Sequence, residues 1–215
     1  MIYILAQGKG SRWTDGQRFP DQHPLPSQYK QLIPVNGEPL MFRTIRLLHE
    51  LEADDFMVIA EGIMFTPEQV DALPNKIQTL RVPGNILEGI WQILKTGEQN
   101  TILLGDVLFS RSLLTSIINH TERSVTLWGR QGKNHFTGKD AGEIFALTVS
   151  SEFVPLLMVQ LDYLKDRADK LWSLYNDWLF SGEFMRVLDW TDDIDSPEAY
   201  EEFFETLERF AKEDA

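Results

Sequence analysis

The first twelve residues constrain the fold more than any other part of the chain. Residues 2–6 form an uninterrupted apolar run, the pattern of a strand that is buried on both faces of a sheet. The segment that follows, Gly8-Lys-Gly-Ser-Arg12, places a cation after each of two glycines. Glycine lets backbone N–H groups turn toward an anion, and the cations Lys9 and Arg12 add positive charge. This strand and turn therefore predict a binding site for a multiply charged phosphate.

Strand and helix patterns alternate along the rest of the chain. Apolar runs predict strands at 56–60, 79–82, 101–107, 124–128, 143–149 and 185–188. Helical spacing and capping residues predict helices at 39–51 and 85–94, and one or two helices within 153–180. Further helices are predicted from Thr66, from Ser110 or Ser112 to 118, and from Ser196 onward. This order predicts a Rossmann-like three-layer α/β/α sandwich with a mostly parallel mixed sheet, and a single domain over 1–215. Ligands of such sheets bind at the carboxyl ends of the strands, where the glycine turn and Asp106 are both expected.

Apolar side chains at helical spacing predict which helix faces enter the core. For the region 153–180 the predicted core residues are Leu156, Leu157, Leu161, Leu164 and Leu171. For the last helix they are Tyr200, Phe203, Phe204, Leu207 and Phe210. Two polar segments that separate predicted elements, 15–28 and 129–142, are longer than most connections and are predicted to be loops over the binding site.

Composition narrows the class of ligand. Asp and Glu outnumber Lys and Arg by 33 to 20, and the formal net charge of -13 argues against a general nucleic-acid binder. A small phosphate ligand remains compatible with this negative net charge, because a bound divalent cation makes the charge of its site locally positive. With no cysteine and only 4 His, the chain favours a hard cation such as Mg²⁺ over zinc. We find no signal peptide and no apolar run long enough for a bilayer, so we expect a cytoplasmic protein without a membrane partner.

The glycine turn differs from two widespread phosphate-binding motifs. It lacks the spacing of a Walker loop, and Trp13 stands where a dinucleotide fingerprint needs its third glycine. The pattern Leu-Ala-x-Gly-x-Gly-Ser-Arg at 5–12, followed by Lys-Gln-Leu-Ile-Pro-Val-Asn-Gly-Glu-Pro-Leu at 30–40, resembles the nucleoside-triphosphate transferase (nucleotidyltransferase) family. Within this family it is similar to short sugar-phosphate and phosphocholine-type cytidylyltransferases. Leu-Leu-Gly-Asp at 103–106 and Asp-Ile-Asp-Ser-Pro-Glu-Ala-Tyr at 193–200 extend the resemblance to the whole chain.

The resemblance implies a role for a small set of residues and a nucleotide-diphospho-sugar transferase-like fold. It implies Arg12 and Lys30 as catalytic cations on the phosphates, and Asp106, Asp193 and Asp195 as carboxylates for Mg²⁺. It implies nucleotide binding by Ala6, Gln7, Gly8, Lys9, Gly10, Ser11, Asn85 and Glu88. Structural roles are the alternatives: Asn85 and Asp106 also suit helix caps, and 192–195 also suits the acidic start of a helix.

The resemblance also implies a reaction. An NTP, with CTP favoured, and a small phosphorylated sugar or alcohol would give an NDP-linked product and pyrophosphate. The acceptor phosphate has a low pKa and needs no general base, which agrees with the lack of a placed His or Cys. Two alternatives stay open. The Asp-x-Asp at 193–195 also suits a glycosyltransferase of related sheet topology, and a non-catalytic nucleotide-binding regulatory protein would keep the same fold.

Overall fold

The central element of the computed structural model is one mixed β-sheet. The structure describes residues 1–6, 30–60, 78–80, 84–94, 98–134, 138, 142–168, 170–177, 180–194, 200, 204–206, 209–210 and 212. Within these residues seven strands pair in the order β10-β8-β9-β6-β1-β4-β5. Their bounds are β1 (Ile2–Ala6), β4 (Phe56–Ala60), β5 (Gln78–Leu80), β6 (Asn100–Leu104), β8 (Val125–Arg130), β9 (Glu143–Val149) and β10 (Glu183–Arg186). Only β9 runs antiparallel to its neighbours, so the predicted mostly parallel mixed sheet is confirmed.

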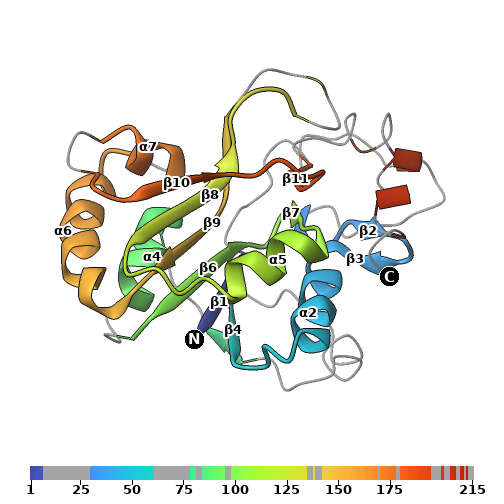
Figure 1. Ribbon diagram of the computed structural model, residues 1–215, viewed down its shortest axis with the longest axis horizontal. Coiled ribbons are helices and arrows are strands. Elements are labelled where there is room, and N and C mark those ends of the chain that lie inside the picture. Colours follow the sequence, from blue (N-terminus) through green and yellow to red (C-terminus); the bar gives the residue numbers. More distant parts are fainter. Residues whose placement is uncertain are drawn as a thin grey trace.

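Helices cover both faces of this sheet, as Figure 1 shows. Helices α2 (Leu40–Glu50) and α5 (Arg111–Ile118) pack on one face, and α4 (Ile86–Ile93), α6 (Val154–Leu164) and α7 (Leu171–Tyr175) pack on the other. Strand β1 contributes alternate residues to the two cores: Ile4 and Ala6 to the first, Tyr3 and Leu5 to the second. The predicted three-layer sandwich is therefore confirmed. None of the described helices is long and apolar enough to cross a membrane.

Short elements lie beside the main sheet. The strands β2 (Pro34–Val35) and β3 (Glu38–Pro39) form a hairpin around Asn36 and Gly37, whose φ angles of 53° and 80° fit the predicted tight turn. A second small ladder joins β7 (Val107–Leu108) to β11 (Asp192–Asp193) in antiparallel fashion, and the sequence did not predict it. Single turns of 3₁₀-helix occur at Lys30–Leu32 (η1) and Ser151–Phe153 (η3).

The helix boundaries follow their capping residues. The Ser110 hydroxyl accepts from the backbone N–H of Leu113 at 3.0 Å, which makes Ser110 rather than Ser112 the N-cap of α5. The predicted helical region 153–180 contains two helices, α6 and α7, and its predicted core residue Leu156 is wrong. Leu156 is 43% exposed, because the buried stripe of α6 runs through Leu157, Leu161 and Leu164 and Leu156 lies about a quarter turn away.

The end of the chain packs as a third, smaller core. Tyr200, Phe204 and Phe210 belong to it, and the Tyr200 hydroxyl donates to the backbone oxygen of Pro34 at 2.7 Å. The predicted core positions Phe203 and Leu207, the helix from Thr66, the start of the last helix at Ser196 and the loop 15–28 lie outside the described residues.

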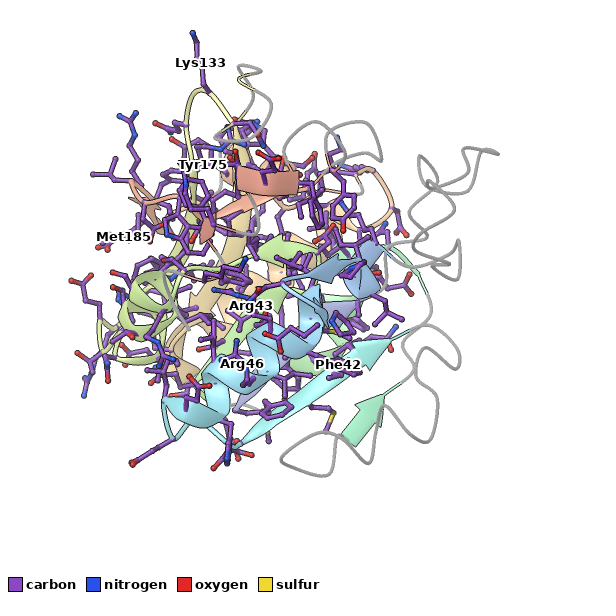
Figure 2. The ribbon with its side chains drawn as sticks, turned by 90° about the vertical axis from the view of Figure 1, so that its right-hand side faces the viewer. Phe42, Arg43, Arg46, Lys133, Tyr175 and Met185 are labelled. Atoms are coloured by element: carbon purple, nitrogen blue, oxygen red, sulfur yellow. The ribbon has the colours of Figure 1, made fainter. Side chains whose placement is uncertain are left out.

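A charged network joins α2 to α5 and β3. The Arg46 guanidinium donates to Glu38 through Nε and Nη2, and to Glu50 through Nη1 at 2.7 Å. Arg111 of α5 also donates to Glu50. Figure 2 labels Arg46 on α2. Burial alone would raise the pKa of Glu50, but the hydrogen bonds from Arg46 and Arg111 outweigh it and lower this pKa.

We therefore expect Glu50→Gln to destabilise the fold in a pH-dependent way. A lowered carboxyl pKa contributes stability that is present above the unfolded-state value of about 4.3 and is lost as the pH falls through the folded-state pKa. The side chain of Glu50 is 34% exposed, so solvent screening limits the loss at pH 7 to about 1 kcal/mol or less. Urea unfolding at pH 7 and pH 3 measures the effect. The difference between wild type and variant should close at pH 3, and an equal difference at both values would contradict this account.

Candidate active site

The structure brings Lys30 and Asp106 together at the carboxyl end of the central strands. Lys30 begins the 3₁₀ turn η1, and Asp106 lies in the turn between β6 and β7. Lys30 Nζ lies 2.5 Å from Asp106 Oδ2, and the two side chains are 15% and 22% exposed. One predicted catalytic cation and one predicted metal ligand thus form an ion pair that solvent and ligands can still reach.

Gly105 explains why the two side chains meet. Its backbone N–H donates to the Leu5 oxygen at 2.8 Å, so the turn after β6 is bound to the end of β1. A Cβ on residue 105 would lie 2.9 Å from that oxygen, 3.4 Å from Gln31 Cγ and 3.5 Å from Ala6 Cβ. The end of β1, the turn η1 and the turn that carries Asp106 are therefore in contact. The predicted phosphate-binding segment begins directly after Ala6 in the sequence.

Gly105→Ala is expected to loosen this junction. The added methyl group clashes with a backbone oxygen rather than with a flexible side chain, so either β1 or the turn must move. Overpacking of this kind costs about 1–3 kcal/mol, and it would also shift Asp106 relative to Lys30. The urea midpoint of the variant measures the loss of stability. A midpoint equal to that of the wild type would show that the contact is not as tight as described.

The β7–β11 ladder brings the backbone of Asp193 to the start of β7. In that ladder Asp193 is the partner of Val107, the residue that directly follows Asp106. The residue is 6% exposed. The alternative of an acidic helix start is wrong for Asp192 and Asp193, because these residues form a strand. Asp195 lies outside the described residues.

Side chains that the sequence did not single out hold β11 in place. The Ser110 hydroxyl hydrogen-bonds to Asp189, and the Ser110 N–H donates to Thr191 Oγ1 at 2.9 Å. The backbone N–H of Thr191 in turn donates to Asp189 Oδ1 at 2.9 Å. The same serine that caps α5 therefore anchors the segment that leads into β11. Its capping role was visible in the sequence, but its link to residues about 80 positions away was not.

A buried cation lies beneath the same segment. Arg43 of α2 is 1% exposed and donates to the backbone oxygen of Phe109 at 2.6 Å. Its guanidinium lies 5.6 Å from the centre of the Trp190 ring, which stacks on Phe210 at 5.2 Å. Arg43 thus links α2, the residue after β7 and the segment that leads into β11.

Asn85 and Glu88 have structural roles in α4. The Asn85 side-chain oxygen accepts from the Glu88 N–H at 3.0 Å, and its amide donates to the backbone oxygens of Lys165 and Ala168 at 2.7 and 3.2 Å. The predicted N-cap is therefore confirmed, and it also fastens α4 to the end of α6. The Glu88 carboxylate lies over Gly84, in the space that a side chain there would need. Binding of the nucleotide by Asn85 and Glu88 stays a prediction.

The second predicted catalytic cation, Arg12, falls in a part of the chain that the structure does not describe. The same part contains the predicted nucleotide-binding residues Gln7, Gly8, Lys9, Gly10 and Ser11. Ala6 ends β1 and is 1% exposed, and nucleotide binding by this residue stays a prediction.

The described carboxylates fit Mg²⁺ in number and kind. Among the residues that the structure describes, no three His, Asp or Glu side chains are grouped to hold a metal ion. Mg²⁺ does not need such a group, because it usually keeps several waters and binds one or two carboxylates together with substrate phosphates. Asp106, in the turn before β7, and Asp193, the ladder partner of Val107, are the two carboxylates that the sequence predicts for this ion.

Comparison with known proteins identifies the fold. No protein-family model matches the chain, and no curated protein matches it in sequence. The CTP:phosphocholine cytidylyltransferase from Streptococcus pneumoniae matches with a TM-score of 0.64 at 17% identity, over 96% of this chain and 98% of that one. The inositol-1-phosphate CTP transferase from T. maritima matches with a TM-score of 0.61 at 14% identity, over 99% and 96%.

A third solved structure matches over a similar share of both chains. It is the 4-diphosphocytidyl-2C-methyl-D-erythritol synthase from Anaerococcus prevotii, with a TM-score of 0.62 at 11% identity, over 98% of this chain and 97% of that one. At these identities the likeness is one of fold. It confirms the resemblance to nucleotidyltransferases that the sequence indicated.

Proposed function

We propose that the chain is an Mg²⁺-dependent nucleotidyltransferase. It transfers NMP from an NTP, with CTP favoured, to a phosphorylated sugar or alcohol, and it releases pyrophosphate. The observation that carries this proposal is the contact between Lys30 Nζ and Asp106 Oδ2 at the carboxyl ends of β1 and β6. A cation for the phosphates and an anion for a metal lie side by side there, directly beyond the strand that leads into the glycine-rich turn.

Each residue has a distinct task in this reaction. Lys30 exchanges its carboxylate partner for an oxygen of the α-phosphate, where negative charge develops as the acceptor attacks. Arg12 donates hydrogen bonds to the β- and γ-phosphates through its planar guanidinium. The backbone N–H groups of the glycine-rich turn donate to the same phosphates. Asp106 and Asp193, with Asp195 as a further ligand, would hold Mg²⁺, which neutralises phosphate charge when bound. The acceptor phosphate oxygen forms the new bond to phosphorus, and pyrophosphate leaves from the opposite side.

The class of substrate is inferred from the solved structures of the same fold. Two of them are named for CTP, with phosphocholine and inositol-1-phosphate as their acceptors. Each match covers at least 96% of both chains. The glycosyltransferase alternative depends on Asp193 and Asp195 alone. It leaves the Gly8–Arg12 turn without a γ-phosphate to bind, because a nucleotide diphosphate sugar carries none.

Pyrophosphate release tests the proposal. CTP, UTP, dTTP, ATP and GTP would each be combined with phosphocholine, inositol 1-phosphate, glucose 1-phosphate and polyol phosphates in the presence of Mg²⁺. We expect release from a narrow set of pairs, which depends on both the NTP and the acceptor. NTP binding without release from any pair would contradict an enzyme of this class and favour the regulatory protein. Release of nucleoside diphosphate from a nucleotide sugar would favour the glycosyltransferase.

A further inference from the structure

A buried arginine at the end of β8 contacts the acidic strand β11. Arg130 donates to Asp192 Oδ1 through both Nε, at 3.2 Å, and Nη2, at 2.9 Å. Its Nη2 also lies 3.9 Å from Asp193 Oδ1. The side chains of Arg130, Asp192 and Asp193 are 5%, 0% and 7% exposed, so the three charges share a site that is almost closed to water.

The contacts place Asp192 between Arg130 and Asp193. The same Oδ1 of Asp192 that accepts from the guanidinium also accepts the backbone N–H of Asp193 at 3.0 Å. This bond fixes the backbone orientation of Asp193, and therefore the direction in which its side chain leaves β11. The shorter distances to Asp192 show that this carboxylate, and not Asp193, is the closer partner of the guanidinium. Arg130 thus compensates the charge of Asp192, and the carboxylate of Asp193 lies farther from the guanidinium.

Arg130 also binds the start of the segment that follows β8. Its Nη1 donates to the Gly132 oxygen at 2.6 Å, and Gly132 has a φ of 112°, a conformation that L side chains rarely adopt. The backbone at Gly132 therefore turns back toward the Arg130 guanidinium. Figure 2 shows the next residue, Lys133, at the outer end of this segment and extending away from the molecule. The guanidinium connects that segment to the strand that carries Asp193.

We infer that Arg130 is a positioning residue for the Asp193 carboxylate. It acts through Asp192 and does not contact the reacting atoms. This role rests on the proposed function, in which Asp193 is a metal ligand. A buried ion pair is seldom a net source of stability compared with a well-packed apolar pair, so its arrangement next to a metal-binding carboxylate suggests a task beyond stability. Groups that orient metal ligands in this way typically change metal affinity 10- to 100-fold when they are removed.

The test uses a variant that neutralises the buried Arg130–Asp192 ion pair as a unit. Arg130→Gln alone would remove the cation that faces the buried Asp192 carboxylate, so the main variant is Arg130→Gln combined with Asp192→Asn. Arg130→Lys is the second variant, because lysine keeps the positive charge but lacks the planar guanidinium that donates through two nitrogens to one carboxylate. The matched control is Arg46→Lys, since Arg46 also donates through Nε and Nη2 to one carboxylate, Glu38, but belongs to the α2 network.

The primary readout is Mn²⁺ binding without substrates. Mn²⁺ alone is titrated into each full-length variant, and the free ion is followed by electron paramagnetic resonance. We expect the dissociation constant to rise about 10- to 100-fold in the double variant and less in Arg130→Lys, with Arg46→Lys unchanged. In turnover assays the Mg²⁺ concentration for half activation should rise by a similar factor, and saturating Mg²⁺ should restore much of kcat. Thermal unfolding confirms that each variant is folded.

The outcomes separate this inference from the proposed function. Wild-type Mn²⁺ affinity in the folded double variant overturns the role of Arg130. If the double variant does not fold, wild-type affinity in Arg130→Lys overturns it instead. Asp106→Asn and Asp193→Asn are measured in parallel. If they weaken Mn²⁺ binding while the Arg130 variants do not, the positioning role fails and the proposed metal site stands. If neither weakens binding, the metal site is misplaced, and the role of Arg130 fails with it.

Discussion

Replacing Asp106 with Asn is expected to lower the rate of nucleotidyl transfer at least about a thousandfold, which corresponds to about 4 kcal/mol in the activation barrier. Asn keeps the shape of the side chain but removes the charge that a divalent cation requires. The fold should survive, because Lys30 keeps some access to water when its partner becomes neutral. We expect a loss of stability of about 1–2 kcal/mol.

Steady-state pyrophosphate release and circular dichroism measure these two effects. Asp54→Asn is the matched control: it makes the same chemical change in a carboxylate that is hydrogen-bonded to His49, where the two side chains are 49% and 46% exposed. This control should retain full activity. If Asp106→Asn were as active as the wild type, the metal site would have to lie elsewhere. If Asp106→Asn were unfolded, Asp106 would have a structural role larger than the one described.

Lys30→Met should have the second largest effect. Methionine has a similar length and lacks the charge that would stabilise the α-phosphate in the transition state. Loss of one such contact usually costs about 100- to 1000-fold in kcat. Because the charge at this phosphate grows during the reaction, kcat should fall more than the affinity for the NTP.

A matched control again comes from the exposed surface. Lys170→Met makes the same change on an exposed side chain at the start of α7, and it should leave kcat unchanged. A rise in KM for the NTP with an unchanged kcat in Lys30→Met would contradict the assigned role. It would place Lys30 on a phosphate whose charge does not change during the reaction.

Most of the main sheet was predictable because its strands are buried on both faces. For β1, β4 and β9 the predicted bounds are those of the structure, since each contains a run of four or five apolar residues that ends before a polar residue. The starts of α4 and α5 followed from the capping residues Asn85 and Ser110, whose side chains form the expected bonds. Strand β10 is shifted by two residues from its prediction. It pairs on one side only within the described residues, and its exposed positions give a weak apolar pattern.

The β7–β11 ladder was not predictable from local patterns. Each strand has two residues, and β11 is Asp192–Asp193, which has no apolar periodicity at all. Its position depends on partners far away in the sequence: Val107 and Leu108 in the ladder, and Arg130 at the end of β8. Nothing in the spacing of these residues indicates that they meet. The sequence therefore identified Asp193 as a candidate ligand but not the arginine that orients its strand.

The candidate site was predictable in its residues but not in its contacts. Lys30 and Asp106 were selected from the resemblance and from the expected strand ends, and the structure places their charged atoms in contact. Gly105, which makes that contact possible, gave no separate signal because it was part of the same short pattern. Asn85 illustrates the opposite case: its role in the cap was one of two alternatives, and the bonds to Lys165 and Ala168 came from tertiary packing.

The fate of each phosphate of the NTP tests the central claim most directly. Two preparations of CTP, or of the NTP that the substrate panel selects, are labelled with ³²P at the α- or the γ-phosphate and incubated with the accepted phosphorylated sugar or alcohol. We predict that the α-label appears in the NDP-linked product and the γ-label in pyrophosphate, and that both transfers are lost in Asp106→Asn. Transfer of the γ-label to the acceptor, or release of the α-label as free nucleotide without product, would contradict nucleotidyl transfer at this site.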